Sequence, residues 1–277
     1  MAEILTEKSE KAIGVFDSGM GGLTCVAEIM KLMPNENIIY FGDTARVPYG
    51  NRSRETILEY ARQDVNFVKK HDVKMIIAAC GTVSSAVGQA KDFGGGVPFT
   101  GVVIPAVQAA CAATRSGRIG VIGTAATIRQ DAVIIGNACP LFVPLVENGI
   151  TAKDDIVVKT MVSRYLEPIK RENVDTLILG CTHYPLLRDA IAEYMGESVK
   201  LISSGAEAAK YTMNMLAMNN IKFEIGKQMH IDGSIKSGPI DGNGFHFCTN
   251  FEDTLRFVSF ESNVLLCEIK AFGKISH

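Results

Sequence analysis

Two cysteines stand out because each ends an apolar run and is closely followed by threonine. Cys80 occupies this position in "MIIAACGTVSS", and Cys181 occupies it in "LILGCTHYPLL". Continuous apolar runs predict strands buried on both faces, and the residues after each cysteine are compatible with a helix. A thiol between a strand and a helix lies at the positive end of the helix dipole, which favours the thiolate. We therefore expect two reactive thiols with lowered pKa values, and we expect Thr82 to cap the helix after Cys80.

Two thiols on opposite sides of one carbon atom would suit racemisation of an amino acid. One thiolate would remove the Cα proton, and the other thiol would return a proton to the opposite face. Asp17 is the candidate proton-handling group beside Cys80, and His183 is the candidate beside Cys181. The alternatives are that Asp17 is a turn residue and that His183 is a structural hydrogen-bonding residue.

The carbanion formed by such a reaction needs hydrogen-bond donors that stabilise its developing charge. Glycine-rich turns expose backbone N–H groups for carboxylate oxygens, and hydroxyl and imidazole groups add side-chain donors. The candidate donors are Asp17–Gly19, Pro48–Gly50, Thr82, Thr124, Thr182 and His183.

Other chemistries receive weaker support from the motifs. The segment "DSGMGGL" lacks both the GxGxxG spacing and the lysine of a phosphate-binding loop. A pyridoxal-phosphate racemase needs a Schiff-base lysine, whereas the strand ends carry cysteines. There is no CxxC motif, and the spacing of Cys181 and His183 is unusual for zinc. We therefore expect neither a metal nor a cofactor. The remaining cysteines are expected to be buried and inert: Cys25, Cys111, Cys139, Cys248 and Cys267.

The composition is that of a globular protein with a sizeable core. The chain has 277 residues, of which 47% are hydrophobic and 21% charged, with a formal net charge of −2. The absence of a basic block argues against nucleic acid or an anionic membrane as the main partner. The polar N-terminal segment shows no signal peptide, and no apolar run approaches the length of a membrane span. With seven cysteines and no export signal, the sequence predicts free thiols in a cytoplasmic protein.

Short apolar runs alternate with helix-length segments, which predicts a doubly wound α/β fold. In Arg52–Lys70, apolar residues recur at the spacing of an amphipathic helix, and a second helix is expected over 205–218. The expected strands are 12–16, 37–41, 73–79, 99–103, 118–123, 141–146, 176–180 and 199–203.

An internal repeat predicts two similar doubly wound α/β domains related by a pseudo-two-fold axis. "IGVFDSG" resembles "IGVIGTA", and the two cysteine segments and the strands at 99–103 and 199–203 follow in the same order. A general likeness among α/β strands is the alternative explanation. If the repeat is real, equivalent strand ends meet at a cleft between the domains, which would hold the active site.

The repeat also suggests where the domains begin and end. We expect a first domain over residues 1–115, carrying Asp17 and Cys80, and a second over 116–205, carrying Cys181 and His183. The C-terminal segment 206–277 is expected to pack back on the first domain. Within it, residues 220–277 show no evident chemistry and are interpreted as packing or assembly structure.

Five motifs resemble, in order, those of the glutamate racemases, cofactor-independent enzymes that supply D-glutamate for peptidoglycan. They are "IGVFDSGMGGL", "YFGDTARVPYG", "AACGTVSSA", "IGVIGTAATI" and "LILGCTHYPLL", and the resemblance extends from Ile13 to Gly205. It implies that the thiols of Cys80 and Cys181 act on opposite faces of the glutamate Cα. It also implies that Asp17 assists Cys80, that His183 and Glu147 assist Cys181, and that the protein is a homodimer.

The resemblance further implies a set of substrate contacts and one departure from the family. The implied contacts are Asp17, Ser18, Tyr49, Gly50, Gly81, Thr82, Thr182 and His183. The family commonly reads "CNTAS" where this chain reads "CGTVS", so Gly81 replaces an asparagine that contacts the substrate. The lost hydrogen bond to a charged group would weaken binding by about 1.5–3 kcal/mol. Two alternatives therefore stay open: a racemase for aspartate or a related acid, and a non-catalytic ligand-binding homologue.

Overall fold

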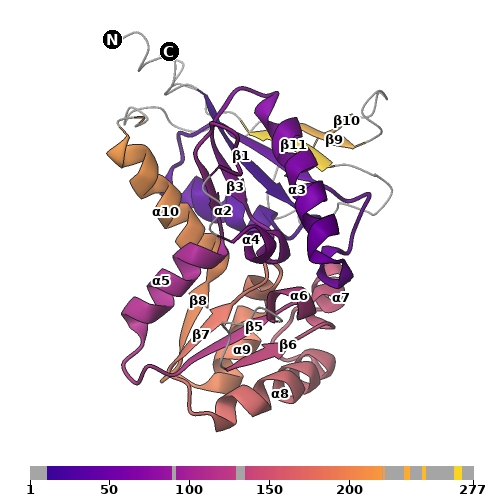
Figure 1. Cartoon of the computed structure of the whole chain (residues 1–277). Coiled ribbons are helices and arrows are strands. Elements are labelled where there is room, and N and C mark those ends of the chain that lie inside the picture. The colour runs from indigo at the N-terminus through magenta and orange to yellow at the C-terminus, as the bar shows by residue number, and fades with distance from the viewer. Residues whose placement is uncertain are drawn as a thin grey trace, which may run out of the picture.

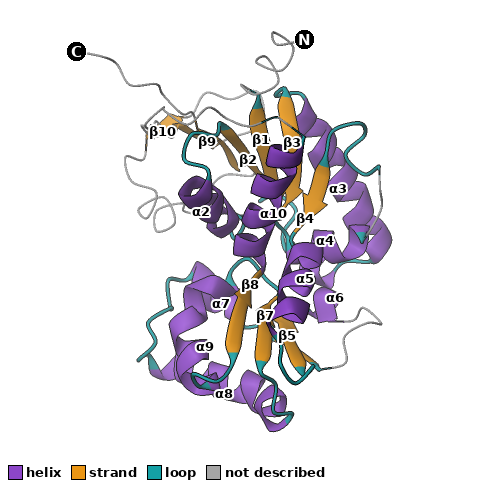
Figure 2. Ribbon diagram, turned by 90° about the vertical axis from the view of Figure 1, so that its left-hand side faces the viewer, coloured by secondary structure: helices purple, strands orange, loops and turns teal. Residues whose placement is uncertain are grey.

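The computed structural model describes residues 11–88, 92–128, 135–219 and 221, and the backbone of three further strands between 234 and 269. These residues form two α/β domains, one above the other in Figure 1, each built around its own sheet. Helices cover both sheets, as the view in Figure 2 shows. The predicted α/β fold with two doubly wound domains is confirmed.

The first sheet combines four parallel strands with three antiparallel ones, in the order β10-β9-β11-β2-β1-β3-β4. Its parallel strands are β1 (Ala12–Asp17), β2 (Ile38–Gly42), β3 (Val73–Ala78) and β4 (Phe99–Gly101). The antiparallel strands are β9 (Ser234–Ser237), β10 (Phe245–Phe247) and β11 (Leu265–Ile269). Strand β11 pairs with β2, so part of the C-terminal segment extends the first sheet. The other residues of 222–277 lie outside the described part of the chain.

The second sheet has four parallel strands in the order β6-β5-β7-β8. They are β5 (Ile119–Gly123), β6 (Gly136–Ala138), β7 (Thr176–Leu179) and β8 (Lys200–Ser203). This order matches β2-β1-β3-β4 of the first sheet, strand for strand, so the internal repeat is confirmed. The two cysteine segments follow β3 and β7, which are equivalent strands.

The repeat extends to the packing of helices on the sheets. Gly14 in β1 lies so close to α3 (Arg54–Lys69) that a Cβ there would meet Val68 at 2.4 Å. At the equivalent position of β5, a Cβ on Gly120 would meet Ile169 of α8 (Ile156–Arg171) at 2.8 Å. Each of these glycines lets a helix approach its sheet closely, and the same arrangement occurs twice.

Local sequence explains why these two helices begin where they do. Ser53 accepts a hydrogen bond from the backbone N–H of Thr56, and Asp155 accepts bonds from the first turn of α8. In α3 the buried side chains recur at helical spacing and pack on the first sheet, as predicted for 52–70. The remaining helices are α2 (Leu23–Leu32), α4 (Gly81–Val87), α5 (Val103–Ala113), α6 (Ala125–Ile128), α7 (Phe142–Glu147), α9 (Arg188–Met195) and α10 (Ser204–Met218), with 3₁₀ turns η1 (Tyr49–Asn51) and η2 (Tyr184–Leu187).

Helices α5 and α10 run side by side where the two domains meet (Figure 1). Ala106 and Ala110 of α5 pack against Ile178 and Ile202 of the second sheet. Helix α10 packs against α2 in the first domain, where Leu216 joins the core around β1. Helix α5 therefore precedes the second domain in the sequence but packs on its sheet, and helix α10 follows the second domain but packs on the first. The domain limits at residues 115 and 205 stay predictions.

One predicted strand is wrong: residues 141–146 form most of helix α7. A short apolar run does not distinguish a strand from a buried helix, and Pro144 removes a donor that a central strand would need. Tyr165 and Tyr184 each make a T-shaped contact with the ring of Phe142, at centroid distances of 5.3 and 5.2 Å. The strand of this region is β6, a few residues earlier. No helix among the described residues is long and apolar enough to cross a membrane.

Candidate active site

One cavity of about 350 Å³ between the domains is lined by all of the predicted site residues. Both sheets contribute the residues that follow the carboxyl ends of their strands, as expected for an open α/β fold. The predicted residues in its lining are Asp17, Ser18, Gly19, Pro48, Tyr49, Gly50, Cys80, Gly81, Thr82, Thr124, Glu147, Cys181, Thr182 and His183. The two halves of the repeat therefore bring both thiols to a single cavity.

Cys80 lies directly before α4 and is only 5% exposed. Its thiol donates a hydrogen bond to Ser18 Oγ over 3.4 Å. Burial, followed by the negative charge of Asp17, raises the pKa of Cys80 to about 12. The expectation that the helix end lowers this pKa is wrong, because desolvation and a nearby carboxylate outweigh a seven-residue helix. Cys80 is therefore a neutral thiol in the ligand-free protein.

Thr82 does not cap α4, contrary to the sequence prediction. Cys80 occupies the N-cap position, and Thr82 is the second residue of the helix. The Thr82 hydroxyl instead lies 2.9 Å from the hydroxyl of Thr124, which follows β5 of the other domain. This pair joins the two domains at the cavity.

Asp17 ends β1 and is buried beside the cavity, with 1% exposure. Its Oδ2 accepts hydrogen bonds from the backbone N–H groups of Gly19 and Gly22, at 3.3 and 2.9 Å. Its Oδ1 has no hydrogen-bond partner among the described residues. A buried carboxylate oxygen without a donor is unfavourable on its own. This oxygen is therefore suited to a ligand that brings a donor or a positive charge.

Cys181, His183 and Glu147 form a thiol–imidazole–carboxylate chain on the second domain. His183 Nδ1 lies 3.8 Å from the Cys181 sulfur, and His183 Nε2 lies 3.1 Å from Glu147 Oε1. Burial alone would lower the pKa of His183, but its bonds to Cys181 and Glu147 outweigh burial and raise the pKa to about 10. His183 is therefore a cation at neutral pH, held between the sulfur and the carboxylate.

Tyr49 contributes to the cavity wall, but its hydroxyl is turned toward a buried acidic pair. The hydroxyl donates to the carboxylates of Asp43 and Asp64. Arg46 bonds to both acids, at 2.5 Å from Asp43 and 2.9 Å from Asp64. Burial, and then the charge of Asp43, raises the pKa of Asp64 to about 7. This network holds the loop that leads from Asp43 to Gly50 at the cavity.

Sequence reasoning did not identify this network or several wall residues. Asp43 and Arg46 stand in the motif "YFGDTARVPYG", but Asp64 lies in α3 with no local pattern to mark it. The missed wall residues are Val47, Asn51, Ala125, Cys139, Pro140, Val143, Pro144 and Gly180. The incorrect strand over 141–146 concealed those around α7. A strand would direct the adjacent residues Val143 and Pro144 to opposite faces, whereas the helix lets both line the cavity together with Glu147.

The expectation of buried, inert cysteines has a mixed outcome. Cys25 and Cys139 are buried, and burial raises the pKa of both thiols, that of Cys25 to about 12. Cys139 nevertheless lines the cavity, and Cys111 is exposed rather than buried. The side chains of Cys248 and Cys267 lie outside the described part of the chain.

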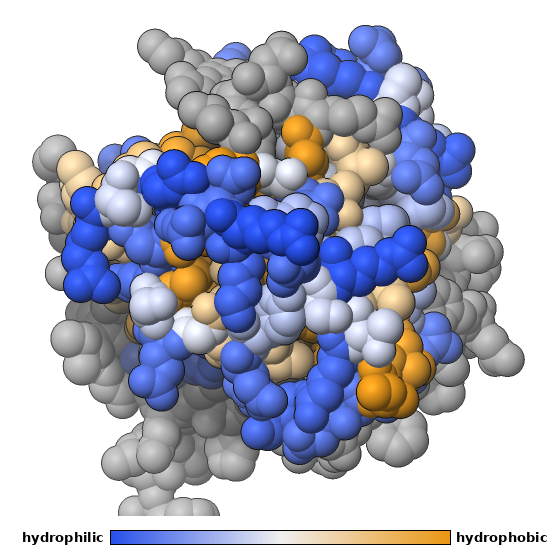
Figure 3. Space-filling model, turned by 90° about the horizontal axis from the view of Figure 1, so that it is seen from below, coloured by the Kyte–Doolittle hydropathy of each residue, from blue (hydrophilic) through white to orange (hydrophobic). Residues whose placement is uncertain are grey.

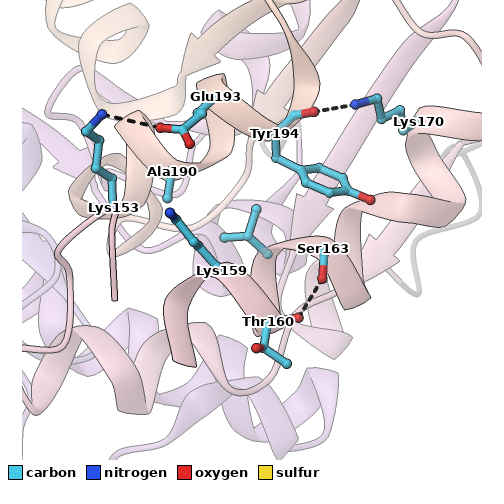
Figure 4. Close-up of a pocket in the computed structure, with 9 residues that line it drawn as sticks. Lys153, Lys159, Thr160, Ser163, Lys170, Ala190, Glu193 and Tyr194 are labelled. Atoms are coloured by element: carbon cyan, nitrogen blue, oxygen red, sulfur yellow. Dashed lines mark hydrogen bonds and ion pairs between the residues drawn. The ribbon is translucent and has the colours of Figure 1, made fainter. Parts of the chain in front are cut away.

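A second cavity lies on the outer face of the second domain, between α8 and α9 (Figure 4). Lysines surround it, but each has a partner: Lys153 pairs with Glu193, Lys159 with Asp154, and Lys170 donates to the carbonyl of Tyr194. Seen from below, this end of the molecule carries mainly hydrophilic side chains (Figure 3). Within the described ranges, no group of three or more His, Cys, Asp or Glu residues could hold a metal ion.

Comparison with protein families gives two matches along the chain. Residues 23–212 match the model described as Asp/Glu/Hydantoin racemase. Residues 206–277 match a different model, described as a domain of unknown function. The glutamate racemase of Geobacter metallireducens is 46% identical over 218 residues, covering 74% of this chain and 80% of the relative. That of Streptococcus gordonii is also 46% identical, covering 72% and 79%.

Solved structures give the same result. Glutamate racemase RacE1 of Bacillus anthracis is 38% identical with a TM-score of 0.72, covering 77% of this chain and 84% of that one. The Francisella tularensis glutamate racemase, solved in complex with D-glutamate, is 36% identical with a TM-score of 0.70, covering 79% and 86%. An aspartate racemase of Picrophilus torridus is 17% identical with a TM-score of 0.51, covering 75% and 94%, and shares the fold alone.

Proposed function

Since the chain belongs to the Asp/Glu/Hydantoin racemase family, among the glutamate racemases, we propose that it interconverts L- and D-glutamate. In the proposed reaction, protons are transferred between the substrate Cα and two thiols. One observation carries the proposal: Cys80 and Cys181 follow equivalent strands of a duplicated fold and line the same cavity. Such a pair can serve the two faces of one carbon atom without a cofactor.

The first domain supplies the proton donor of the ligand-free protein. Cys80 is neutral there, because burial and Asp17 disfavour its thiolate. Once the thiol has given its proton to the Cα carbanion, the hydrogen bond with Ser18 reverses to stabilise the sulfur anion. Before the next turnover, the Cys80 thiolate takes a proton from water by way of Asp17, and Cys181 releases to water the proton that it removed from Cα.

The second domain supplies the base. A protonated His183 lies 3.8 Å from the sulfur of Cys181, where its charge balances that of a thiolate. Glu147 bonds to the far nitrogen and fixes the orientation of the imidazole ring. The unlike surroundings make one thiol the acceptor and the other the donor, and the reverse reaction exchanges their roles.

Substrate recognition follows from the polar groups that line the cavity. The Asp17 Oδ1 atom is suited to the substrate ammonium group, since this oxygen is buried without a donor of its own. Ser18, Thr82, Thr124 and Thr182 supply hydroxyl groups for the carboxylates. The D-glutamate complex of the Francisella tularensis relative supports an acidic amino acid as the ligand.

The cellular role extends this proposal by analogy with the family. D-Glutamate made by the enzyme would be used in peptidoglycan synthesis. A homodimer and a cytoplasmic location are part of the same proposal, and each stays a prediction.

The deciding experiment is α-proton exchange in D₂O, with L-glutamate and L-aspartate as separate substrates and no added cofactor. NMR follows deuterium at Cα, and chiral chromatography follows the enantiomers. We expect deuterated D-glutamate from the reduced protein, and loss of racemisation in both Cys80→Ser and Cys181→Ser. Turnover of aspartate alone would reassign the substrate. Absence of exchange with either acid would favour a non-catalytic binding protein.

A further inference from the structure

Gly81 lies where the two thiol-bearing loops touch. It is the first residue of α4, directly after Cys80. A Cβ at this position would lie 2.2 Å from the carbonyl oxygen of Gly180, 3.3 Å from the Gly180 carbonyl carbon and 3.8 Å from Cys181 Cα. All three atoms belong to the backbone of the other loop, so no side-chain rotation could relieve the contact.

The same pattern recurs elsewhere along this boundary. A Cβ on Gly21 would meet the His183 ring and the Thr182 hydroxyl at 2.5 Å, and a Cβ on Gly50 would meet Thr124 at 3.2 Å. These three glycines belong to the first domain, and each faces residues of the second domain that line the cavity. Because glycine has no side chain, the two domains can approach each other closely around the site.

Polar contacts hold the closed arrangement in register. Thr24 donates to the carbonyl of Thr182 over 2.8 Å, beside Gly21. The hydroxyls of Thr82 and Thr124 lie 2.9 Å apart, beside Gly81. Packed interiors do not absorb a new atom without displacement. A Cβ on Gly81 would thus separate the loops by most of an ångström or break these contacts.

We propose that Gly81 is a positioning residue that sets the distance between the two thiol-bearing loops, and that a side chain at this position opens the cleft. This inference rests on the proposed racemase function for its kinetic consequences. It reverses the expectation drawn from the sequence alone, in which Gly81 only removes a substrate contact that asparagine would make. In this chain, asparagine at position 81 would collide with the Gly180 carbonyl before its amide could reach a substrate.

The test compares Gly81→Ala and Gly81→Asn with wild type by two readouts. The first is the rate at which iodoacetamide alkylates Cys80 and Cys181, mapped by mass spectrometry, which reports opening of the cleft without requiring activity. Both thiols are at most 6% exposed, so we expect several-fold faster alkylation in both variants. The second is the steady-state rate of racemisation. We expect kcat to fall by up to about 100-fold with a smaller change in KM, because misplacing reacting groups by about 1 Å has effects of this size.

Gly205→Ala is the matched control. Gly205 also lies in the first turn of a helix, and its Cβ would contact a backbone atom of Cys25 at 3.1 Å, but it does not line the cavity. We expect this variant to lower Tm while its alkylation rate and kcat stay close to wild type. Alanine favours helices more than glycine does, so helix propensity cannot explain a loss in Gly81→Ala.

The outcomes separate this proposal from the proposed function. Unchanged alkylation rates in both Gly81 variants would overturn the positioning role, and so would a kcat/KM of Gly81→Asn equal to or above that of wild type. An inactive wild-type protein would refute the racemase function. In that case the alkylation rates would still decide whether Gly81 sets the opening of the cleft.

Discussion

Glu147→Gln removes the negative charge from one end of the Cys181–His183–Glu147 chain while keeping its shape. In the wild type, Glu147 Oε1 lies 3.1 Å from His183 Nε2. Glutamine can still accept a hydrogen bond from this nitrogen, but a neutral acceptor stabilises the imidazolium less than a carboxylate does. The substitution should therefore lower the pKa of His183 from its raised value of about 10.

The structure sets the size of this change. Hydrogen bonds to charged groups contribute about 1.5–3 kcal/mol, and the 27% exposure of the Glu147 side chain places this one at the low end. A neutral acceptor retains about half of that energy. Since about 1.4 kcal/mol corresponds to one pH unit, the pKa of His183 should fall by about half a unit. The basic limb of the pH dependence of kcat/KM should move to lower pH by the same amount.

The sign of the stability effect follows from linkage. A histidine whose pKa is higher in the folded than in the unfolded protein stabilises the fold below about pH 6.5, and the stabilisation disappears as the pH rises through the folded value. Glu147→Gln should therefore lower Tm more at pH 6 than at pH 10. Titration of the His183 ring by NMR gives the pKa directly. Glu172→Gln, which removes an exposed ion pair with Arg118, is the control. It should change neither the pH dependence of kcat/KM nor the NMR titration of His183. An unshifted pH profile with an unshifted NMR titration would refute the role assigned to Glu147.

Further predictions concern the thiols, the acidic network and the core. In Cys80→Ser and Cys181→Ser, kcat should fall unequally for the L-to-D and D-to-L directions, because the two thiols have different neighbours; KM should change in parallel, since the two enantiomers are equally stable. Equal losses of kcat in both directions, measured by polarimetry at saturating substrate, would contradict this asymmetry. The pKa of Asp64 is raised to about 7 in the folded protein, whereas the unfolded chain ionises at about pH 4, so the free energy of unfolding falls as the pH rises from about 4 to 7. Asp64→Asn should flatten the dependence of Tm on pH in this range. Phe142→Ala should lower the free energy of unfolding by about 3–5 kcal/mol in urea titrations, because the ring is fully buried against two tyrosines; a loss below about 1 kcal/mol would show that it does not anchor α7.

The sequence predicted the fold well where its signals were repeated. Strands buried on both faces give continuous apolar runs, and duplication of the domain gave two examples of each run in the same order. The positions of Cys80 and Cys181 after equivalent strands then followed, as did their meeting at one cavity. Glu147 lies in none of the five motifs and was identified only through the family resemblance, since no local pattern indicates its place near His183.

Other features depend on contacts between distant segments and leave no local signal. Helix α7 was mistaken for a strand because a six-residue apolar run fits either element, and tertiary packing of Phe142 decides between them. Asp64 joins Tyr49 and Arg46 only because α3 passes behind the loop that carries them. The effect of Gly81 was also hidden, since its importance comes from the backbone of Gly180, about a hundred residues away.

The unexpected pKa of Cys80 connects these features to the chemistry. The end of a helix stabilises a thiolate, but the sulfur loses more stabilisation when it is removed from water. Closure of the domains buries the Cys80 sulfur beside Asp17, so the pKa of this thiol is raised. Tight closure therefore holds one thiol in its protonated form, while the second thiol lies beside the imidazolium of His183. Opening the cleft would admit water to Cys80 and lower its pKa toward the ordinary value of a cysteine, because burial would then disfavour the thiolate less. The glycine contacts that close the domains would then set both the spacing of the thiols and the protonated state of Cys80.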